Sequence, residues 1–235
     1  MIKRAFVYGD LLFESMLVIN NEIQYSKKHF ERLTKSAGIL KMDLPEKFDF
    51  DNFTQSILNE INGKTNCRVR FVLHRNSLGF YLPNSNRTDF IIEVFDLPEN
   101  WKKENEKIKK VGVFTEQKKA IGPYSNLKSG NALIYVMAKI WAKENGMDDA
   151  LILNQNGNII EAASSNIYWK KKNNIYTVPL SEGCIAGVSR EVFIESCNAN
   201  NTPIIEQICT IEDLKNADKI FMSNASTGIS SIELA

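Results

Sequence analysis

Histidine and cysteine are scarce in this sequence of 235 residues, which contains two histidines and four cysteines. Two histidines, His29 and His74, argue against a zinc site built from His and Cys, and we expect no metal centre. The cysteines are far apart and form no C-x-x-C pair. This spacing argues against a disulfide framework and favours a reducing compartment, so we expect a cytoplasmic protein.

An excess of charge of either sign is also missing. The chain has 29 basic and 28 acidic residues, for a formal net charge of +1. This balance argues against a nucleic-acid partner or a membrane surface. No uninterrupted apolar run approaches the roughly 18 residues of a membrane-spanning helix, and the start of the chain lacks the apolar core of a signal peptide. We therefore expect neither a signal peptide nor a transmembrane helix.

The hydrophobic content, 43%, is enough for one large domain or two small ones. Asn20-Asn21 and Asn156-Gly157 are typical of tight hairpin turns. Helical spacing of apolar residues predicts helices after an N-cap at Ser26, over 52–61, from a cap at Ser129 to about 145, over 188–197, and after a cap at Thr210. Strands are expected at 13–19, 23–25, 68–74, 89–95, 110–114, 150–153, 159–161, 166–169, 175–178, 204–208 and 219–223. The pattern predicts a mixed α+β chain.

The stretch 115–127 has little periodicity and contains Gly122-Pro123. Such a stretch is typical of a linker. We therefore expect a small N-terminal domain over 1–118 and a larger domain over 119–235.

Five short segments contain candidate functional residues. They are YGD with FES (8–10 and 13–15), HFERL (29–33), LKSGN (127–131), GNIIEAASSNI (157–167) and GCIAGVSR (183–190). In this order and at these distances they resemble the class IV aminotransferase family, the fold-type-IV pyridoxal-phosphate (PLP) enzymes. The resemblance implies a two-domain α+β fold like that of D-amino-acid aminotransferases, with a small N-terminal and a larger C-terminal α/β domain. It also implies a homodimer that binds PLP and acts on a small molecule.

Two residues match the family's catalytic positions. Lys128 matches the lysine that holds PLP as a Schiff base, a role that needs an amine able to lose its proton. Glu161 matches the carboxylate that faces the pyridine nitrogen and keeps it protonated, so that the ring can take up electrons. Without the resemblance, Lys128 would be read as one surface lysine among many, and Glu161 as an exposed residue at a strand end.

The remaining cofactor contacts implied by the resemblance are mostly phosphate ligands. Arg32 matches the arginine that binds phosphate with its fork of donors. The stretch 187–189 opens a helix, whose free amides favour an anion. The turn 224–228 offers amides and hydroxyls to a phosphate or to a substrate carboxylate. The expected cofactor-binding residues are Arg32, Lys128, Glu161, Asn166, Val188, Ser189, Ala225 and Ser226.

Tyr8 and Arg70 fall where the family lines its substrate pocket. Arg70 lies in an alternating strand, where it either binds a carboxylate or faces solvent. Leu11 stands where the family usually has a second glycine, and the chain is short at both ends relative to the family. These departures affect the substrate assignment more than the cofactor assignment.

Three activities are common in the family: branched-chain aminotransfer, D-amino-acid aminotransfer and lysis of 4-amino-4-deoxychorismate. Bacterial branched-chain enzymes place a Tyr where this chain has Ala132, and their second phosphate turn is Gly-Thr rich, where this chain has Asn224-Ala225. The segments YWKK (168–171) and IYT (175–177) are similar to a hairpin of the lyases. The sequence therefore favours the lyase, in folate synthesis, with an aminotransferase as the main alternative and a non-catalytic PLP-binding relative as a minor one.

Overall fold

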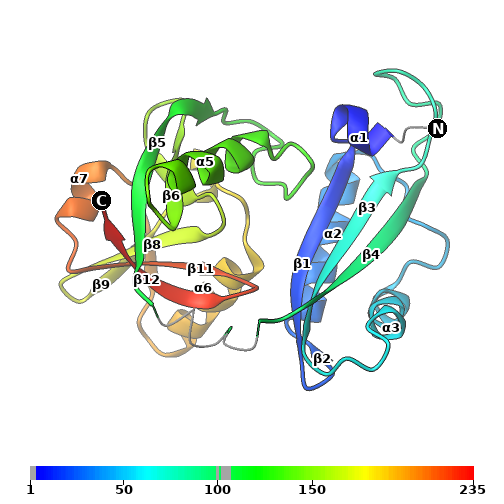
Figure 1. The fold of residues 1–235 in the computed structure, drawn as a ribbon, viewed down its shortest axis with the longest axis horizontal. Coiled ribbons are helices and arrows are strands. Elements are labelled where there is room, and N and C mark those ends of the chain that lie inside the picture. The colour runs from blue at the N-terminus through cyan, green and yellow to red at the C-terminus, as the bar shows by residue number, and fades with distance from the viewer. Residues whose placement is uncertain (1–3, 99–100, 102–106) are drawn as a thin grey trace. The chain divides into compact units, whose positions relative to one another are not determined.

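The structure, a computed structural model, describes residues 4–98, 101 and 107–235. The chain forms two compact units (Figure 1). Unit 1 contains Met1–Glu99 and Leu127–Asn131, and unit 2 contains Asn100–Asn126 and Ala132–Ala235. No helix among the described residues is long and apolar enough to cross a membrane.

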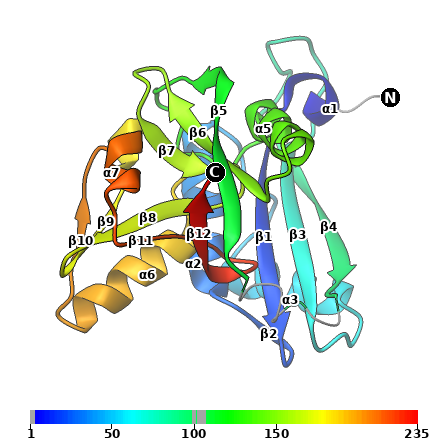
Figure 2. The same cartoon turned by 60° about the vertical axis from the view of Figure 1, so that its left-hand side comes forward.

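Unit 1 is an antiparallel sheet with two helices on one face (Figure 2). The strand order is β2-β1-β3-β4. Asn20 and Asn21 have positive φ values of 52° and 65°, which a two-residue hairpin turn requires. The elements are α1 (Arg4–Tyr8), β1 (Leu11–Ile19), β2 (Glu22–Ile23), α2 (Ser26–Ile39), α3 (Phe50–Glu60), β3 (Cys67–Arg75) and β4 (Thr88–Asp96).

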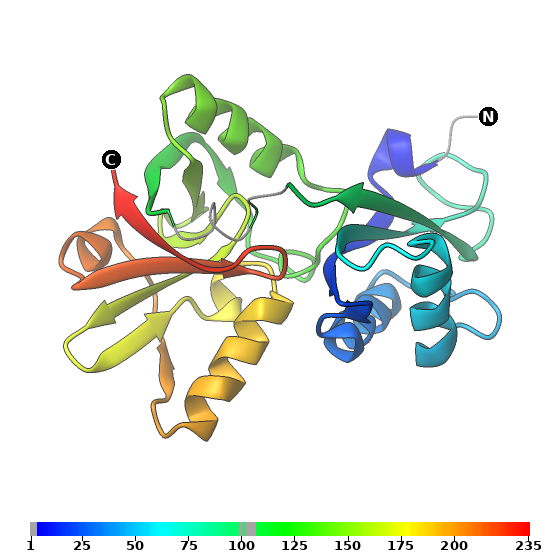
Figure 3. The same ribbon diagram turned by 60° about the horizontal axis from the view of Figure 1, so that its bottom comes forward.

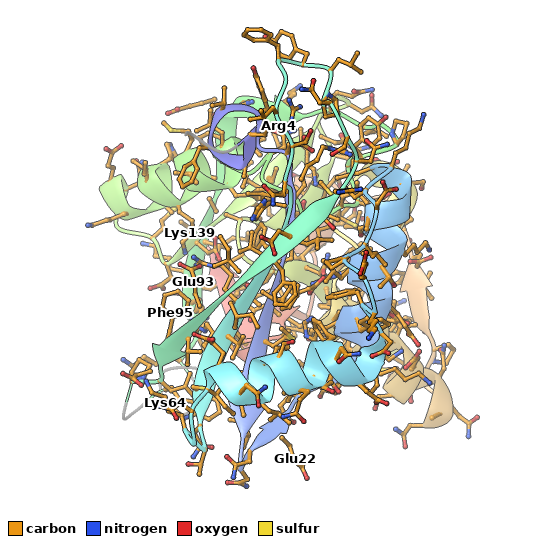
Figure 4. The ribbon with its side chains drawn as sticks, turned by 90° about the vertical axis from the view of Figure 1, so that its right-hand side faces the viewer. Arg4, Glu22, Lys64, Glu93, Phe95 and Lys139 are labelled. Carbon is orange, nitrogen blue, oxygen red and sulfur yellow. The ribbon has the colours of Figure 1, made fainter. Side chains whose placement is uncertain are left out.

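Alternation along β3 and β4 separates the two faces of this sheet. Phe71 of β3 is fully buried, and its ring centroid lies 4.9 Å from those of Phe53 of α3 and Phe90 of β4. Glu93 and Phe95 lie on the face of β4 away from α2 (Figure 4). The helix-covered face therefore holds the core, and the other face carries polar and partly exposed apolar side chains.

Unit 2 is built on an eight-stranded mixed sheet with the order β10-β9-β8-β11-β12-β5-β6-β7. Three residues, 163–165, join β7 at one end of this order to β8 near the other, so the sheet curls. The elements are β5 (Lys109–Lys119), α5 (Leu133–Glu144), β6 (Asp149–Asn154), β7 (Ile159–Ala162), β8 (Asn166–Lys171), β9 (Asn174–Thr177), the 3-10 helix η1 (Leu180–Glu182), α6 (Val188–Ala199), β10 (Ile204–Glu206), α7 (Ile211–Lys215), β11 (Lys219–Asn224) and β12 (Gly228–Leu234).

Helices α5 and α6 lie on opposite sides of this sheet (Figure 3). Ala138 of α5 belongs to the same buried cluster as Trp169 of β8. Phe193 of α6 instead packs edge-on against Tyr168 and Phe221, whose rings stack at 5.1 Å. Because Tyr168 and Trp169 are adjacent on β8, they point to opposite faces.

Two expected helix caps are wrong. Helix α2 begins at Ser26, and its N-cap is Tyr25, in a left-handed conformation and without a side-chain cap. The cap of α5 is Ala132, not Ser129. Ser129 forms a β-bridge with Leu12, because its segment extends the open edge of β1 instead of starting the helix.

Other local signals are confirmed. Thr210 caps α7 in a capping box with Asp213. Gly146, with φ of 67°, follows the C-cap of α5, and Gly157, with φ of 87°, turns the β6–β7 hairpin.

The boundary between the units differs from the one expected after residue 118. Strand β5 pairs in parallel with β6 and β12, so residues 115–119, expected in a linker, belong to the sheet of unit 2. Leu127–Asn131 returns to unit 1. There the Phe13 amide donates to the Lys128 carbonyl at 3.0 Å, and the Gly130 amide donates to the Leu11 carbonyl at 3.0 Å.

Candidate active site

The expected site residues divide between the two units. Unit 1 holds Tyr8, Arg32, Arg70 and Lys128. Unit 2 holds Glu161, Asn166, Val188, Ser189, Ala225 and Ser226.

Lys128 is fixed by the backbone of its segment along β1. Its half-buried side chain places Nζ 4.3 Å from the centroid of the Phe13 ring, a cation–π distance. Gly130 is needed nearby, because a Cβ there would lie 2.8 Å from the carbonyl oxygen of Gly9. The lysine is thus carried on a strand-like edge rather than on a helix cap.

Arg32 of α2 forms a buried ion pair with Glu14 of β1. Its Nε donates to Glu14 Oε1 at 2.8 Å, and Nη2 pairs with Oε2. His29 Nδ1 lies 2.6 Å from the same Oε2. Burial alone would raise the pKa of Glu14, but the Arg32 charge and the hydrogen bonds from His29 and Arg32 outweigh it and lower that pKa to about 2. Glu14 therefore holds one edge of the Arg32 guanidinium in a fixed plane.

The two expected substrate residues already have contacts within unit 1. The Tyr8 ring packs against Tyr81 at 5.3 Å between centroids. Arg70 Nη1 lies 3.1 Å from Glu93 Oε2, and its guanidinium lies 5.0 Å from the Phe95 ring centroid. The Arg70 and Glu93 side chains are 48% and 45% exposed, so this is a solvent-screened pair. Arg70 would have to exchange or share Glu93 to bind a carboxylate.

Glu161 of β7 is a buried carboxylate of unit 2, with 3% of its side chain exposed. Lys119 Nζ donates to Oε1 at 2.9 Å, and the Tyr135 hydroxyl donates to the same oxygen at 2.8 Å. The Ile185 amide donates to Oε2 at 2.9 Å. Three donors from β5, α5 and the loop before α6 thus meet one carboxylate.

Two further groups near Glu161 stay protonated. Burial, and then the Glu161 charge, raises the pKa of the Tyr135 hydroxyl far above its ordinary value. Burial, and then the same charge, raises the pKa of the Cys184 thiol to about 12. Tyr135 is therefore a hydrogen-bond donor to Glu161 at neutral pH, and Cys184 is a neutral thiol.

Helix α6 begins with an arrangement suited to an anion. Its N-cap, Gly187, brings no side-chain oxygen to the first turn, where the amides of Val188 and Ser189 precede the first intrahelical bond. A Cβ on Gly187 would collide with Asn166 Oδ1, so glycine is required for this close packing. The geometry is consistent with the phosphate role expected of this turn.

The turn after β11 is organised by its own first residue. Asn224 Oδ1 accepts from the amides of Ser226 and Thr227 at 2.9 and 2.8 Å, and from the Thr227 hydroxyl at 3.0 Å. The Ser226 amide, expected to bind the cofactor, therefore already has an acceptor inside the chain. The Ala225 amide and the Ser226 hydroxyl remain as the candidate ligands here.

A chain of short contacts joins these parts of unit 2. Asn224 Nδ2 donates to Ser165 Oγ at 2.9 Å. The next residue, Asn166, donates through Nδ2 to the Ile185 carbonyl at 2.9 Å, and the Ile185 amide reaches Glu161. The structure thus places the two candidate phosphate turns and Glu161 at one end of the curled sheet.

Sequence reasoning missed Lys119 and Tyr135. Lys119 ends a strand in a basic pair with Lys118, which is typical of a solvated surface. Tyr135 lies in an apolar helix, where an aromatic residue is typically core. No local signal marks either residue, because their partner Glu161 is 42 and 26 positions away.

The chain matches the family model for amino-transferase class IV over residues 11–234. The chain belongs to the class IV aminotransferase family. It is 26% identical to a D-alanine aminotransferase of Staphylococcus haemolyticus, over 97% of this chain and 80% of that protein. It is 23% identical to an aminodeoxychorismate lyase of Vibrio harveyi, over 97% of this chain and 84% of that protein. Branched-chain amino acid aminotransferase of Escherichia coli has the same fold, with a TM-score of 0.89, 23% identity, and coverage of 100% of this chain and 80% of that one.

This class IV protein is thus a PLP-dependent enzyme of fold type IV. The residues present fit the cofactor. The start of α6 supplies uncapped amides for a phosphate, and Glu161 is a buried carboxylate with acceptor capacity left on Oε2. Lys128 would supply an amine from a segment whose backbone is bonded to β1.

Proposed function

We propose that this enzyme is a 4-amino-4-deoxychorismate lyase, which converts its substrate into 4-aminobenzoate and pyruvate. The observation that carries the proposal is the Asn224 side chain, which takes up the amides of Ser226 and Thr227. The Vibrio harveyi relative, named an aminodeoxychorismate lyase, also supports it.

The argument rests on where each substrate carries its carboxylates. An amino acid has a carboxylate on the same carbon as its amine, so an aminotransferase needs donors for that group beside the cofactor. The amine of 4-amino-4-deoxychorismate is on a ring carbon without such a carboxylate. A turn whose amides are satisfied by Asn224 offers fewer donors for an α-carboxylate. It therefore suits the lyase substrate better than an amino acid.

The proposed roles follow from the chemistry of each side chain. Bound PLP supplies an electron-withdrawing ring that stabilises negative charge on the substrate carbon next to nitrogen. Lys128 Nζ removes the proton from that carbon, and Glu161 holds a proton at the pyridine nitrogen. The bond from the ring to the enolpyruvyl oxygen then breaks, the substrate ring becomes aromatic, and the departing group takes up a proton to give pyruvate. Arg32, Val188, Ser189, Ala225 and Ser226 bind phosphate, Asn166 supports the start of α6, and Tyr8 and Arg70 face the substrate.

The proposal also covers the cellular location, oligomeric state and metabolic route of the enzyme. We expect a cytoplasmic homodimer in a route to folate, with a small-molecule substrate. A monomeric mass in light scattering, together with full activity, would contradict the dimer.

The deciding experiment offers purified enzyme 4-amino-4-deoxychorismate in one assay. In a second assay it offers a panel of L- and D-amino acids with 2-oxoglutarate. The proposal expects equal amounts of 4-aminobenzoate and pyruvate in the first and little glutamate in the second. Rapid glutamate formation without 4-aminobenzoate would replace the lyase with an aminotransferase. Absence of turnover in both assays, with PLP bound, would support the non-catalytic alternative.

A further inference from the structure

Lys119 makes a direct charged contact with the carboxylate on which the proposed chemistry depends. Its Nζ lies 2.9 Å from Glu161 Oε1 and 2.5 Å from the Tyr135 oxygen, and the side chain is only 12% exposed. Tyr135 closes the triangle by donating to Oε1 at 2.8 Å. An ammonium so placed is shielded from water and contributes its charge to Glu161 more strongly than a surface lysine would.

The number of donors on each oxygen shows where another one would bind. A carboxylate oxygen accepts about two hydrogen bonds, and Oε1 already has two, from Lys119 and Tyr135. Oε2 accepts only from the Ile185 amide among its hydrogen bonds in the described residues. A pyridine N–H that approaches Glu161 therefore meets Oε2, while Lys119 stays on Oε1.

The same geometry separates the role of Lys119 from that of Lys128. The pyridine nitrogen and the aldehyde carbon of PLP lie at opposite ends of the ring. A lysine hydrogen-bonded to the carboxylate at the nitrogen end cannot also attach to the carbonyl end. Lys119 is thus not a second attachment lysine.

We propose that Lys119, held in place by Tyr135, is a positioning residue that orients Glu161 and weakens its hold on the proton of the pyridine nitrogen. The inference rests on the role proposed above for Glu161. The ammonium offsets part of the Glu161 charge and repels a protonated pyridine, so both effects lower the affinity of the ring nitrogen for its proton. Lys119 thereby limits how strongly the ring withdraws electrons, compared with a ring beside Glu161 alone.

Titratable side chains face Glu161 from several elements of unit 2. Lys119 comes from β5, Tyr135 from α5, and Cys184 from the loop before α6. Because the pKa of both Tyr135 and Cys184 is raised, neither loses its proton below about pH 9. A change in ring protonation between pH 5 and 9 is then not caused by titration of Tyr135 or Cys184.

The test uses the enzyme loaded with PLP that carries nitrogen-15 in the ring, and follows the ring-nitrogen NMR shift against pH. In Lys119→Met we expect the midpoint of ring deprotonation to rise by about one pH unit, because one nearby positive charge is gone. Glu161→Gln should move the midpoint in the opposite direction. Lys118→Met removes the same charge from the neighbouring exposed position and should leave the midpoint unchanged.

Two further variants separate charge from structure. Lys119→Arg keeps the charge and should stay near the wild-type midpoint, whereas Tyr135→Phe should raise the midpoint by less than Lys119→Met does. If Lys119→Met cannot be purified, the Tyr135→Phe midpoint decides: an unchanged value contradicts the inference. A midpoint that responds to Glu161→Gln but not to Lys119→Met overturns the role of Lys119 and leaves the proposed function standing. A midpoint insensitive to Glu161→Gln refutes the proposed role of Glu161 itself.

Discussion

Each unit contains a buried carboxylate beside a basic side chain at a candidate cofactor-binding residue, and these two pairs, Glu14 with Arg32 and Glu161 with Lys119, are built differently. Glu14 in unit 1 pairs with Arg32, whose Nε and Nη2 span both carboxylate oxygens. Glu161 in unit 2 pairs with Lys119, which contacts one oxygen. Arginine is permanently charged and binds through a rigid fork, whereas lysine is a point charge on a flexible stem. The first pair is suited to fixing structure, and the second leaves its carboxylate able to accept another partner.

The pKa directions sharpen this contrast. The lowered pKa of Glu14 means that its ionised form is stabilised by folding. Around Glu161 the shifts instead affect its neighbours, Tyr135 and Cys184, which are kept protonated. The carboxylate of unit 1 thus contributes to stability, and that of unit 2 creates an environment for another charged group.

The largest expected effect tests which lysine, Lys128 or Lys119, attaches the cofactor. If Lys119 rather than Lys128 attached the cofactor, Lys119 would not act as the ion-pair partner of Glu161. The comparison of the two ion pairs would then no longer hold. We expect Lys128→Ala to abolish covalent PLP attachment and activity, and Lys119→Met to keep the attachment. Borohydride reduction followed by peptide mass spectrometry measures this, and PLP found on a peptide with Lys119 would refute the assignment.

The next effect concerns Glu14, whose loss should destabilise the fold. Glu14→Gln leaves Arg32 and His29 facing a neutral group in a buried site. Removing one partner of a buried ion pair costs about 3 to 5 kcal/mol. We expect urea unfolding to show a loss of about 3 kcal/mol, since glutamine keeps part of the hydrogen bonding.

Acid titration gives a second measure of the same residue. Because the folded pKa of about 2 lies below the ordinary 4.5, this stabilisation is complete above about pH 4.5 and is lost as pH falls toward 2. The Gln variant should lack this part of the acid dependence. An equal acid dependence in both proteins would show that Glu14 is not the responsible group. Glu93→Gln serves as a control, because its pair with Arg70 is half exposed and should change stability by less than about 1 kcal/mol.

Glu161 should differ from Glu14 in that its loss reduces turnover as well as stability, because Glu161→Gln also leaves a basic side chain, Lys119, facing a neutral group in a buried site. Gln keeps the size of the side chain but cannot hold a proton at the pyridine nitrogen. We expect kcat to fall by at least about 100-fold, or about 2.7 kcal/mol of barrier, with a much smaller change in KM. Steady-state kinetics and the melting temperature measure the two effects. A normal kcat would leave Glu161 as a structural carboxylate like Glu14.

Sequence alone predicted the parts of the fold that depend on neighbouring residues. The Asn20-Asn21 turn, the Asn156-Gly157 hairpin and the Thr210 cap are set within a few positions. The Ser129 cap was wrong because its segment pairs with β1, more than a hundred positions earlier, and a β-bridge left no helix to cap. Strand β12 was not predicted, although it forms a local hairpin with β11 as well as a distant pairing with β5.

For the candidate site, too, the sequence identified some residues but not the contacts that depend on distant parts of the chain. The family resemblance identified Glu161 and Arg32 as charged residues of interest. The resemblance could not show that Glu14 forms an ion pair with Arg32 or that Lys119 contacts Glu161, because these partners are 18 and 42 positions apart in the chain. Ion pairs between distant elements depend on tertiary packing, which no local pattern encodes.

The smallest expected effect asks whether Arg32 serves only Glu14 or also the cofactor phosphate. Arg32→Lys keeps a positive charge beside Glu14 but removes the planar fork, and Lys and Arg are not equivalent where two parallel hydrogen bonds are needed. If Arg32 also binds phosphate, PLP should dissociate about tenfold more readily, a loss of about 1.4 kcal/mol. The absorption spectrum of bound PLP should stay the same, because phosphate contacts position the cofactor and do not tune its ring. Dissociation is measured by dilution and fluorescence, and the melting temperature of the apo form reports the effect on Glu14 separately. A lower melting temperature with unchanged PLP affinity would show that Arg32 serves Glu14 alone, so that its ion pair is purely structural, in contrast to the pair of Lys119 with Glu161.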